Sequence, residues 1–136
     1  MEKAVGVTLS KKKIKTTSLS KRSKIIKVIT DAILDKKGEN IISLDLRKIN
    51  EAVADFFIVC EASSHPQVRA IAEHIKTETI KHCKEEPHHF EGRQSLNWVL
   101  IDYINVVIHI MLPDTRKFYK LEEMWGDAAK EEYIDK

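Results

Sequence analysis

One apolar stretch constrains this chain more than any other feature: NWVLIDYINVVIHIML, residues 97–112. The stretch is shorter than the run of about 20 apolar residues that a membrane-spanning helix needs. It is rich in Val and Ile and is interrupted near its middle by Asp and Asn, which is typical of two strands joined by a tight turn. We therefore expect strands at 96–102 and 106–112 around a turn at 103–105.

The length of that turn decides which side chains of the two strands share a face, because successive residues of a strand point to opposite sides. A two-residue turn at 104–105 brings the large and polar side chains of both strands together. A three-residue turn instead pairs the same residues of the first strand with Ile108 and Ile110. We favour the two-residue turn, because it leaves an aliphatic face for the core. The other face, here called the mixed face, then comprises Trp98, Leu100, His109 and Met111.

The sequence before this hairpin predicts two helices and two strands. Apolar residues recur at helical spacing from Ile25 to Ile33, and Gly38 is a helix stop signal. A β-type run follows at 41–47. A second run at 55–60 is apolar on both faces, which indicates a central position in a sheet.

Capping signals define the second helix. Ser64 and Gln67 form a capping-box pattern, and Pro66 falls in the first turn, where its missing N–H costs nothing. This helix should end near Glu86, before Pro87. The loop that follows has room for a short strand.

After the hairpin, Asp114 can cap a last helix. Phe118, Leu121 and Trp125 share a face of that helix, which we expect to fray over 127–136. The order of elements predicts a single α/β domain over residues 21–136, with a mixed β-sheet packed by helices.

Charge is distributed unevenly along the 136 residues. Residues 1–27 carry nine basic residues against one acidic residue, a net charge of +8, while the remainder carries fourteen against twenty, a net charge of −6. We expect residues 1–20 to form a basic disordered tail that can contact phosphate without base readout. The acidic remainder argues against sequence-specific nucleic-acid binding and suits a basic protein partner.

Cysteine usage and the N-terminus favour a cytoplasmic protein. Cys60 and Cys83 are too few for a disulfide framework. No apolar segment precedes a small-residue cleavage site, and no segment suggests a membrane partner. The lysine-rich start favours a bacterial cytoplasm over a mitochondrion.

Catalytic and cofactor motifs are absent from the sequence. The four glycines form no phosphate-binding loop, and no serine has a G-x-S-x-G frame. Asp45 could hold a metal ion, but Arg47 occupies the next position on the same strand face, and its positive charge opposes metal binding. The remaining candidate ligands, which no repeated spacing supports, are Cys83, His88, His89 and His109. We expect no enzyme activity, metal or cofactor.

Three segments resemble the ribosomal silencing factor family, also called RsfS or Iojap-like: DFFIVCEASS-x-x-QVRAIAEHI, FEG-x5-WVLIDYINVVIHIM and R-x-FYKLEEMW. The resemblance covers roughly residues 25–128, in the family's order and spacing. Glu61-Ala62 stands where many members have Thr-Gly, and Ile104-Asn105 where many have Gly-Asp, so we expect the departures to affect local turn shape rather than the fold.

The resemblance implies a binding protein rather than an enzyme. Members dock on the large ribosomal subunit through ribosomal protein L-fourteen, block joining of the small subunit and repress translation when nutrients are short. Their fold is similar to that of nucleotidyltransferases without the active site. Two rival hypotheses remain: an atypical enzyme of nucleotide transfer, and a general RNA-binding module that uses the basic tail.

The mixed face is the expected docking surface, because Trp and Met are enriched at interfaces. Homodimerisation could hide such a patch in the free protein. In the alternative, the last helix covers the face with Phe118, Leu121 and Trp125, and His109 is a core residue bonded to a carboxylate such as Asp102. The complete set of expected partner contacts is Trp98, Leu100, Asp102, His109, Met111, Arg116, Tyr119 and Glu122.

Overall fold

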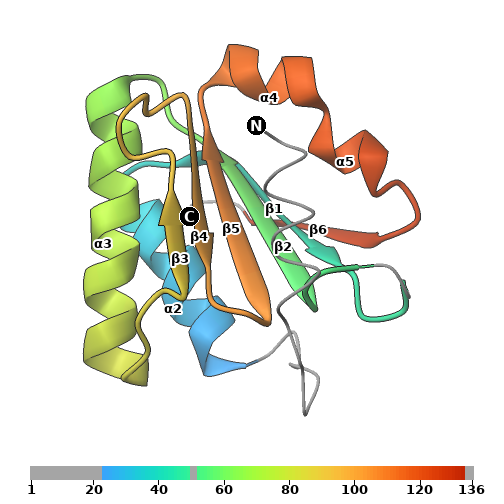
Figure 1. Cartoon of the computed structure of the whole chain (residues 1–136), viewed down its shortest axis with the longest axis horizontal. Coiled ribbons are helices and arrows are strands. Elements are labelled where there is room, and N and C mark those ends of the chain that lie inside the picture. Colours follow the sequence, from blue (N-terminus) through green and yellow to red (C-terminus); the bar gives the residue numbers. More distant parts are fainter. Residues whose placement is uncertain (1–22, 50–51, 134–136) are drawn as a thin grey trace.

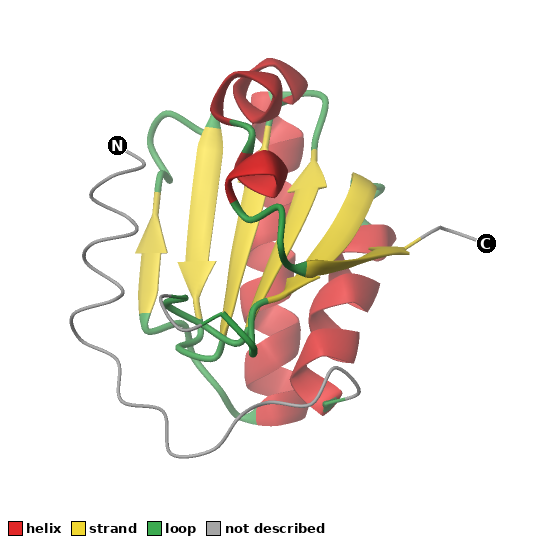
Figure 2. Ribbon diagram, turned by 90° about the vertical axis from the view of Figure 1, so that its right-hand side faces the viewer, coloured by secondary structure: helices red, strands yellow, loops and turns green. Residues whose placement is uncertain are grey.

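A six-stranded sheet lies between two unequal helical layers in the computed structural model, which describes residues 23–49 and 52–133 (Figure 1). Two long helices cover one face, and two short helices lie on the other (Figure 2). The expected tail over 1–20 lies outside the described residues. The helices are α2 (Lys24–Asp35), α3 (His65–Cys83), α4 (Pro113–Tyr119) and α5 (Leu121–Met124). The strands are β1 (Glu39–Asp45), β2 (Phe56–Glu61), β3 (His89–Glu91), β4 (Trp98–Asp102), β5 (Val106–Met111) and β6 (Ala129–Tyr133).

The sheet is mixed, as predicted. Its strand order is β3-β4-β5-β2-β1-β6; β2 and β5 run parallel and the other neighbours run antiparallel. The parallel pair occupies the middle of the sheet, where both faces of each strand are covered. The prediction of a central strand at 55–60 is therefore confirmed.

The hairpin has the register of the two-residue turn. Trp98 pairs with Met111, and Leu100 pairs with His109. At the turn, the Ile104 N–H donates to Asp102 Oδ1 at 2.7 Å. Ile104 has a φ of 73°, an unusual conformation for a β-branched residue.

The N-terminus of α3 follows its capping signal. Ser64 Oγ accepts a hydrogen bond from the Gln67 N–H at 3.2 Å, and Pro66 lies in the first turn. The helix ends at Cys83, earlier than the predicted Glu86, because Lys84 adopts a left-handed conformation with φ 56°.

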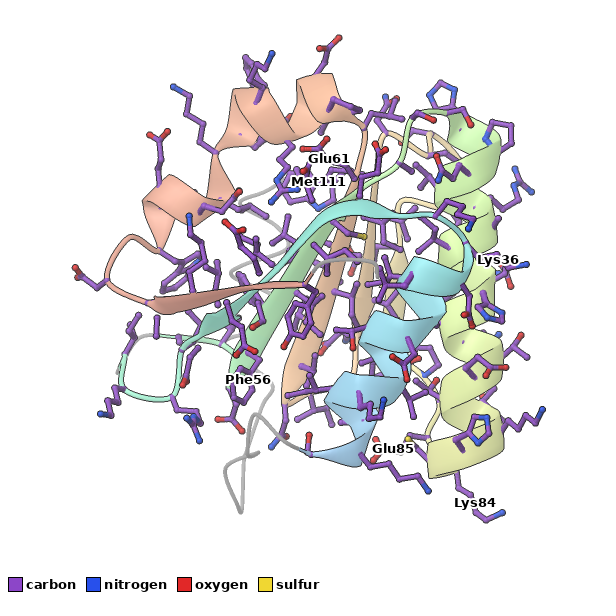
Figure 3. All side chains as sticks on the ribbon, turned by 180° about the vertical axis from the view of Figure 1, so that it is seen from behind. Lys36, Phe56, Glu61, Lys84, Glu85 and Met111 are labelled. Atoms are coloured by element: carbon purple, nitrogen blue, oxygen red, sulfur yellow. The ribbon has the colours of Figure 1, made fainter. Side chains whose placement is uncertain are left out.

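The main core lies between the sheet and the two long helices. Ile29 and Ile33 of α2 and Ile71 and Ile75 of α3 are fully buried against the aliphatic side of the central strands. Figure 3 shows this layer from behind, with Phe56 and Glu61 at the two ends of β2. Apolar burial of this kind is the dominant stabilising contribution in a small domain.

The C-terminal prediction was wrong in part. The last helix breaks at Lys120, which has a φ of 51°, into α4 and α5. Asp114 lies in the first turn of α4 rather than at its cap. Instead of a fraying helix, β6 follows and pairs antiparallel with β1. Apart from Tyr133, its residues AKEEY have low strand propensity, and β6 forms because the edge of β1 offers unpaired backbone groups.

Candidate docking surface on the second face of the sheet

The mixed face is buried, which contradicts the expectation of a solvent-exposed surface. Trp98 and His109 are 3% and 1% exposed, and Leu100 and Met111 are fully buried. Asp102, which was expected to meet a basic partner, is also fully buried. At this burial, none of these side chains presents a surface to a partner.

Aromatic rings from the C-terminal segment cover this face. The Tyr119 ring lies 4.8 Å from that of Trp98, and the Trp125 ring lies 5.8 Å from that of Phe57. Leu121 is buried in the same cluster. The alternative of a covered face is thus confirmed for Leu121 and Trp125. It is wrong for Phe118, which points away and is 77% exposed.

His109 is a neutral core residue. The indole Nε1–H of Trp98 donates to His109 Nδ1 at 3.0 Å, so the ring proton resides on Nε2. Burial lowers the pKa of His109 from 6.5 to about 3. The expected partner was a carboxylate such as Asp102, but the bond runs to Trp98 instead. His109 Nε2 is buried and has no hydrogen-bond partner among the described residues.

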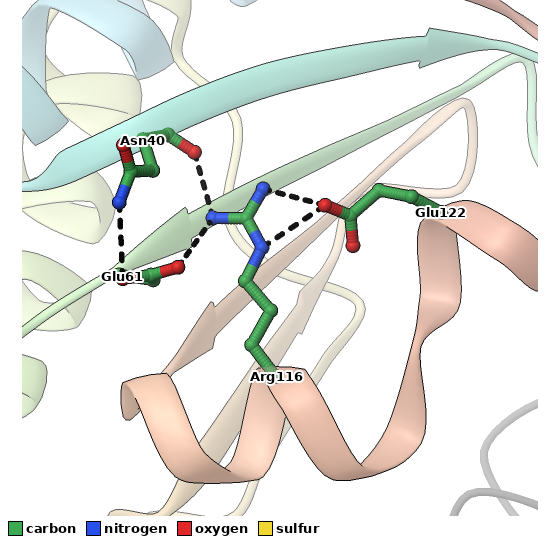
Figure 4. A network of polar contacts seen from close by, with 4 residues as sticks. All are labelled: Asn40, Glu61, Arg116 and Glu122. Carbon is green, nitrogen blue, oxygen red and sulfur yellow. Dashed lines mark hydrogen bonds and ion pairs between the residues drawn. The ribbon is translucent and has the colours of Figure 1, made fainter.

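Arg116 and Glu122, both expected to contact a partner, are bound to each other. Arg116 Nε and Nη2 donate to Glu122 Oε2 at 3.1 and 2.8 Å. Nη1 donates to the backbone carbonyl of Asn40 at 2.7 Å and to Glu61 Oε2 at 3.3 Å (Figure 4). Arg116 is 8% exposed, so its charge is largely satisfied inside the protein.

Exposed apolar side chains remain on the solvent side of α4 and α5. Phe118 is 77% and Met124 is 60% exposed, and Tyr119 is half-buried with its ring 4.9 Å from that of Phe118. We call Phe118, Tyr119 and Met124 the outer patch. Sequence reasoning missed Met124, because it lies off the helical face of Leu121 and Trp125. Its position off that face is the one signal in the sequence for its exposure.

The described residues offer little chemistry elsewhere. Over 23–49 and 52–133, no group of three or more His, Cys, Asp or Glu residues could hold a metal ion. Asp45 Oδ2 lies 2.7 Å from Arg47 Nη2, the pairing that their spacing suggested. Burial raises the pKa of the Cys60 thiol to about 12, so it is not a thiolate at neutral pH. None of the described helices is long and apolar enough to cross a membrane.

Known proteins resemble this chain over most of its length. The sequence model of a family described as ribosomal silencing factor during starvation matches residues 19–136. The ribosomal silencing factor RsfS of Bacillus subtilis is 39% identical over 104 residues, 76% of this chain and 86% of the relative. A crystal structure of a Chromobacterium violaceum protein is similar with a TM-score of 0.70 at 33% identity, covering 82% of this chain and 91% of that one. A Mus musculus protein, named mitochondrial assembly of ribosomal large subunit protein 1, is 34% identical over 74 residues, 52% of this chain and 32% of the relative.

Proposed function

Because the chain belongs to the ribosomal silencing factor family, we propose that it binds the large ribosomal subunit through ribosomal protein L-fourteen and sterically blocks joining of the small subunit. It would thereby repress translation under nutrient limitation, in a bacterial cytoplasm. The family match over 19–136 is the observation that carries this proposal. The name of the mouse relative supports the large subunit as the target.

The outer patch is the docking surface in this proposal. Exposed aromatic and Met side chains are enriched at protein interfaces, and a few of them usually carry most of the binding energy. Phe118 and Met124 are both more than half exposed on the same short segment. The mixed face lies directly beneath this segment. We assign it the role of supporting α4 and α5 rather than of contacting the partner.

Charge over the whole domain, rather than on this segment, favours a basic partner. On the segment itself, Glu122 and Glu123 are balanced by the exposed Lys117 and Lys120. The chain beyond residue 27 has a net charge of −6. A protein embedded in ribosomal RNA needs basic residues to neutralise phosphate, so long-range attraction would speed association.

The proposed mechanism is steric and requires no bond to be made or broken. The bound domain would occupy a surface that the small subunit needs. Its affinity must therefore compete with subunit association, and its cellular concentration would set the degree of repression.

Subunit joining on a sucrose gradient tests this proposal. Purified subunits would be mixed with wild-type protein, with Phe118→Ser, or with Ile80→Ser, a control on an exposed apolar residue of α3. We expect wild type and Ile80→Ser to comigrate with the large subunit and block joining, and Phe118→Ser to bind at least about tenfold more weakly.

Each other outcome has a clear meaning. If wild type binds neither subunit, the proposed function is wrong. If Phe118→Ser blocks joining as well as wild type, the function stands and the surface is wrong. Binding that requires residues 1–20 and falls steeply with salt would favour the RNA-binding alternative. The expected homodimer predicts that free wild type sediments as a dimer and Phe118→Ser as a monomer.

A further inference from the structure

We propose that Arg116 is a positioning residue of the docking surface, holding α4 and α5 on the ends of β1 and β2. It acts on the ribosomal partner through Phe118 and Met124, without touching the partner itself. This inference rests on the proposed function, and it replaces the expectation that Arg116 is a direct partner contact.

The guanidinium joins three separate parts of the chain. Its Nε and Nη2 grip Glu122 of α5, and its Nη1 reaches both the Asn40 carbonyl of β1 and the Glu61 carboxylate of β2 (Figure 4). Most of its N–H groups therefore already have acceptors. The Arg116 side chain is 9% exposed, which leaves little of it for a partner to reach.

The backbone on the strand side is shaped to meet Arg116. The pairing of β1 with β2 shifts register between Glu39 and Ile42, and Asn40 within this irregularity has a φ of 51°. Asn tolerates this left-handed conformation better than most residues. Its Nδ2 also donates to Glu61 Oε1 at 3.1 Å, so both Glu61 oxygens are held, one by Asn40 and one by Arg116.

The backbone on the helix side is shaped in the same way. Lys120, with a φ of 51°, ends α4 and redirects the chain into α5. This break brings Glu122 back beside Arg116, although the two residues are six apart in sequence and would not share a face of a continuous helix. The cation therefore holds the angle between the helices that carry Phe118 and Met124.

Two short helices need such a restraint. With seven and four residues, α4 and α5 are far below the length at which an isolated helix is stable in water. Their position depends on tertiary contacts, and Arg116 supplies charged contacts from α4 to both β1 and β2. A surface ordered before binding loses less conformational entropy on association and so binds more tightly.

The test combines amide hydrogen exchange on the isolated full-length protein with affinity for the large subunit. Arg116→Met removes the charge, and Arg116→Lys keeps it but cannot reproduce the planar fork. We expect both variants to speed exchange over 113–125 about tenfold, to leave exchange in α2 and α3 unchanged, and to weaken binding about tenfold. Phe118→Ser should weaken binding without changing exchange.

Two further measurements separate positioning from general stability and from direct contact. Ile33→Val, a core variant of the opposite sheet face, should lower global stability without changing affinity when fully folded. Arg116→Met should cost less affinity in the Phe118→Ser background than in wild type, because both act through one surface. Unchanged exchange over 113–125, or fully additive losses, would overturn the proposal. Failure of wild type to bind would defeat the proposed function, and the exchange result would then decide alone whether Arg116 holds α4 and α5.

Discussion

The two faces of the sheet are covered by different means. On one face, α2 and α3 pack with fully buried aliphatic side chains such as Ile29, Ile33 and Ile75. On the other, the short helices α4 and α5 add rings and a charged network centred on Arg116 to a smaller apolar cluster that includes Leu100, Met111 and Leu121. Aliphatic packing is non-directional and strong, whereas hydrogen bonds and ion pairs depend on geometry.

Under the proposed function, this difference separates stability from binding. The face with long helices can hold the domain together without presenting anything to a partner. The other face contains the buried polar residue His109 and exposes Phe118 and Met124 on its outer side. We expect substitutions on the first face to act on unfolding, and those on the second to act also on binding.

The largest effect should come from the aliphatic face. Ile33→Ala removes a fully buried side chain of α2 and should lower the free energy of unfolding by about 2–5 kcal/mol. Urea denaturation measures this, with Ile80→Ala as a control that should stay within about 0.5 kcal/mol, since Ile80 is exposed. Equal losses of unfolding free energy for Ile33→Ala and Ile80→Ala would contradict the idea that burial sets the size of the effect.

On the mixed face, a hydrogen bond should matter more than ring volume. Trp98→Phe keeps an aromatic ring against Tyr119 but leaves His109 Nδ1 without its donor at a buried site. The free energy of unfolding should fall by about 1–3 kcal/mol. Trp125→Phe, on a half-buried indole, should cost less in the same denaturation experiment. A larger loss of stability for Trp125→Phe than for Trp98→Phe would show that ring packing matters more than the hydrogen bond to His109.

Acid should weaken the fold through His109. The pKa of this residue is about 3 in the folded protein and about 6.5 when unfolded, so the unfolded chain takes up the proton first. The contribution of neutral His109 to the free energy of unfolding is complete above pH 6.5. It falls by about 1.4 kcal/mol per pH unit as the pH decreases from 6.5 toward 3. His109→Asn retains an acceptor for Trp98 and should remove this slope. Parallel pH profiles of wild type and variant between pH 7 and 5 would contradict the assignment.

The smallest effect should come from an exposed ion pair on the aliphatic side. Lys27 Nζ lies 3.0 Å from Asp31 Oδ2 on α2, and both side chains are more than half exposed. Asp31→Asn should change the free energy of unfolding by less than about 0.5 kcal/mol, because water and salt screen the pair. Thermal denaturation measures this change. A greater loss of stability would mean that the exposed pair contributes as much as the partly buried pair of Arg116 and Glu122.

Local patterns predicted much of the sheet and little of the proposed docking surface. The register of the hairpin followed from alternation of side chains and from a two-residue turn, both of which are short-range properties. The cap at Ser64 was predictable for the same reason. The burial of Trp98 and His109 was not, because it depends on which segment folds over them.

The errors share one physical cause. The sequence pattern of Phe118, Leu121 and Trp125 predicted one continuous helix, but the chain turns at Lys120, and Phe118 is exposed while Leu121 is buried. The Arg116 contact with Asn40 joins residues 76 positions apart, a separation that no local period encodes. β6 formed where an open strand edge was available, against its own propensity.

The sequence by itself determined the α/β class, the central strand, the hairpin register and the resemblance to ribosomal silencing factors. Those features depend on side-chain period, turn length and motif spacing, all of which are read along the chain. Only the tertiary structure decided that the mixed face is buried, that Arg116 and Glu122 bind each other, and that Phe118 and Met124 are exposed. These outcomes depend on contacts between distant segments, where the direction of a few short helices settles which groups meet water.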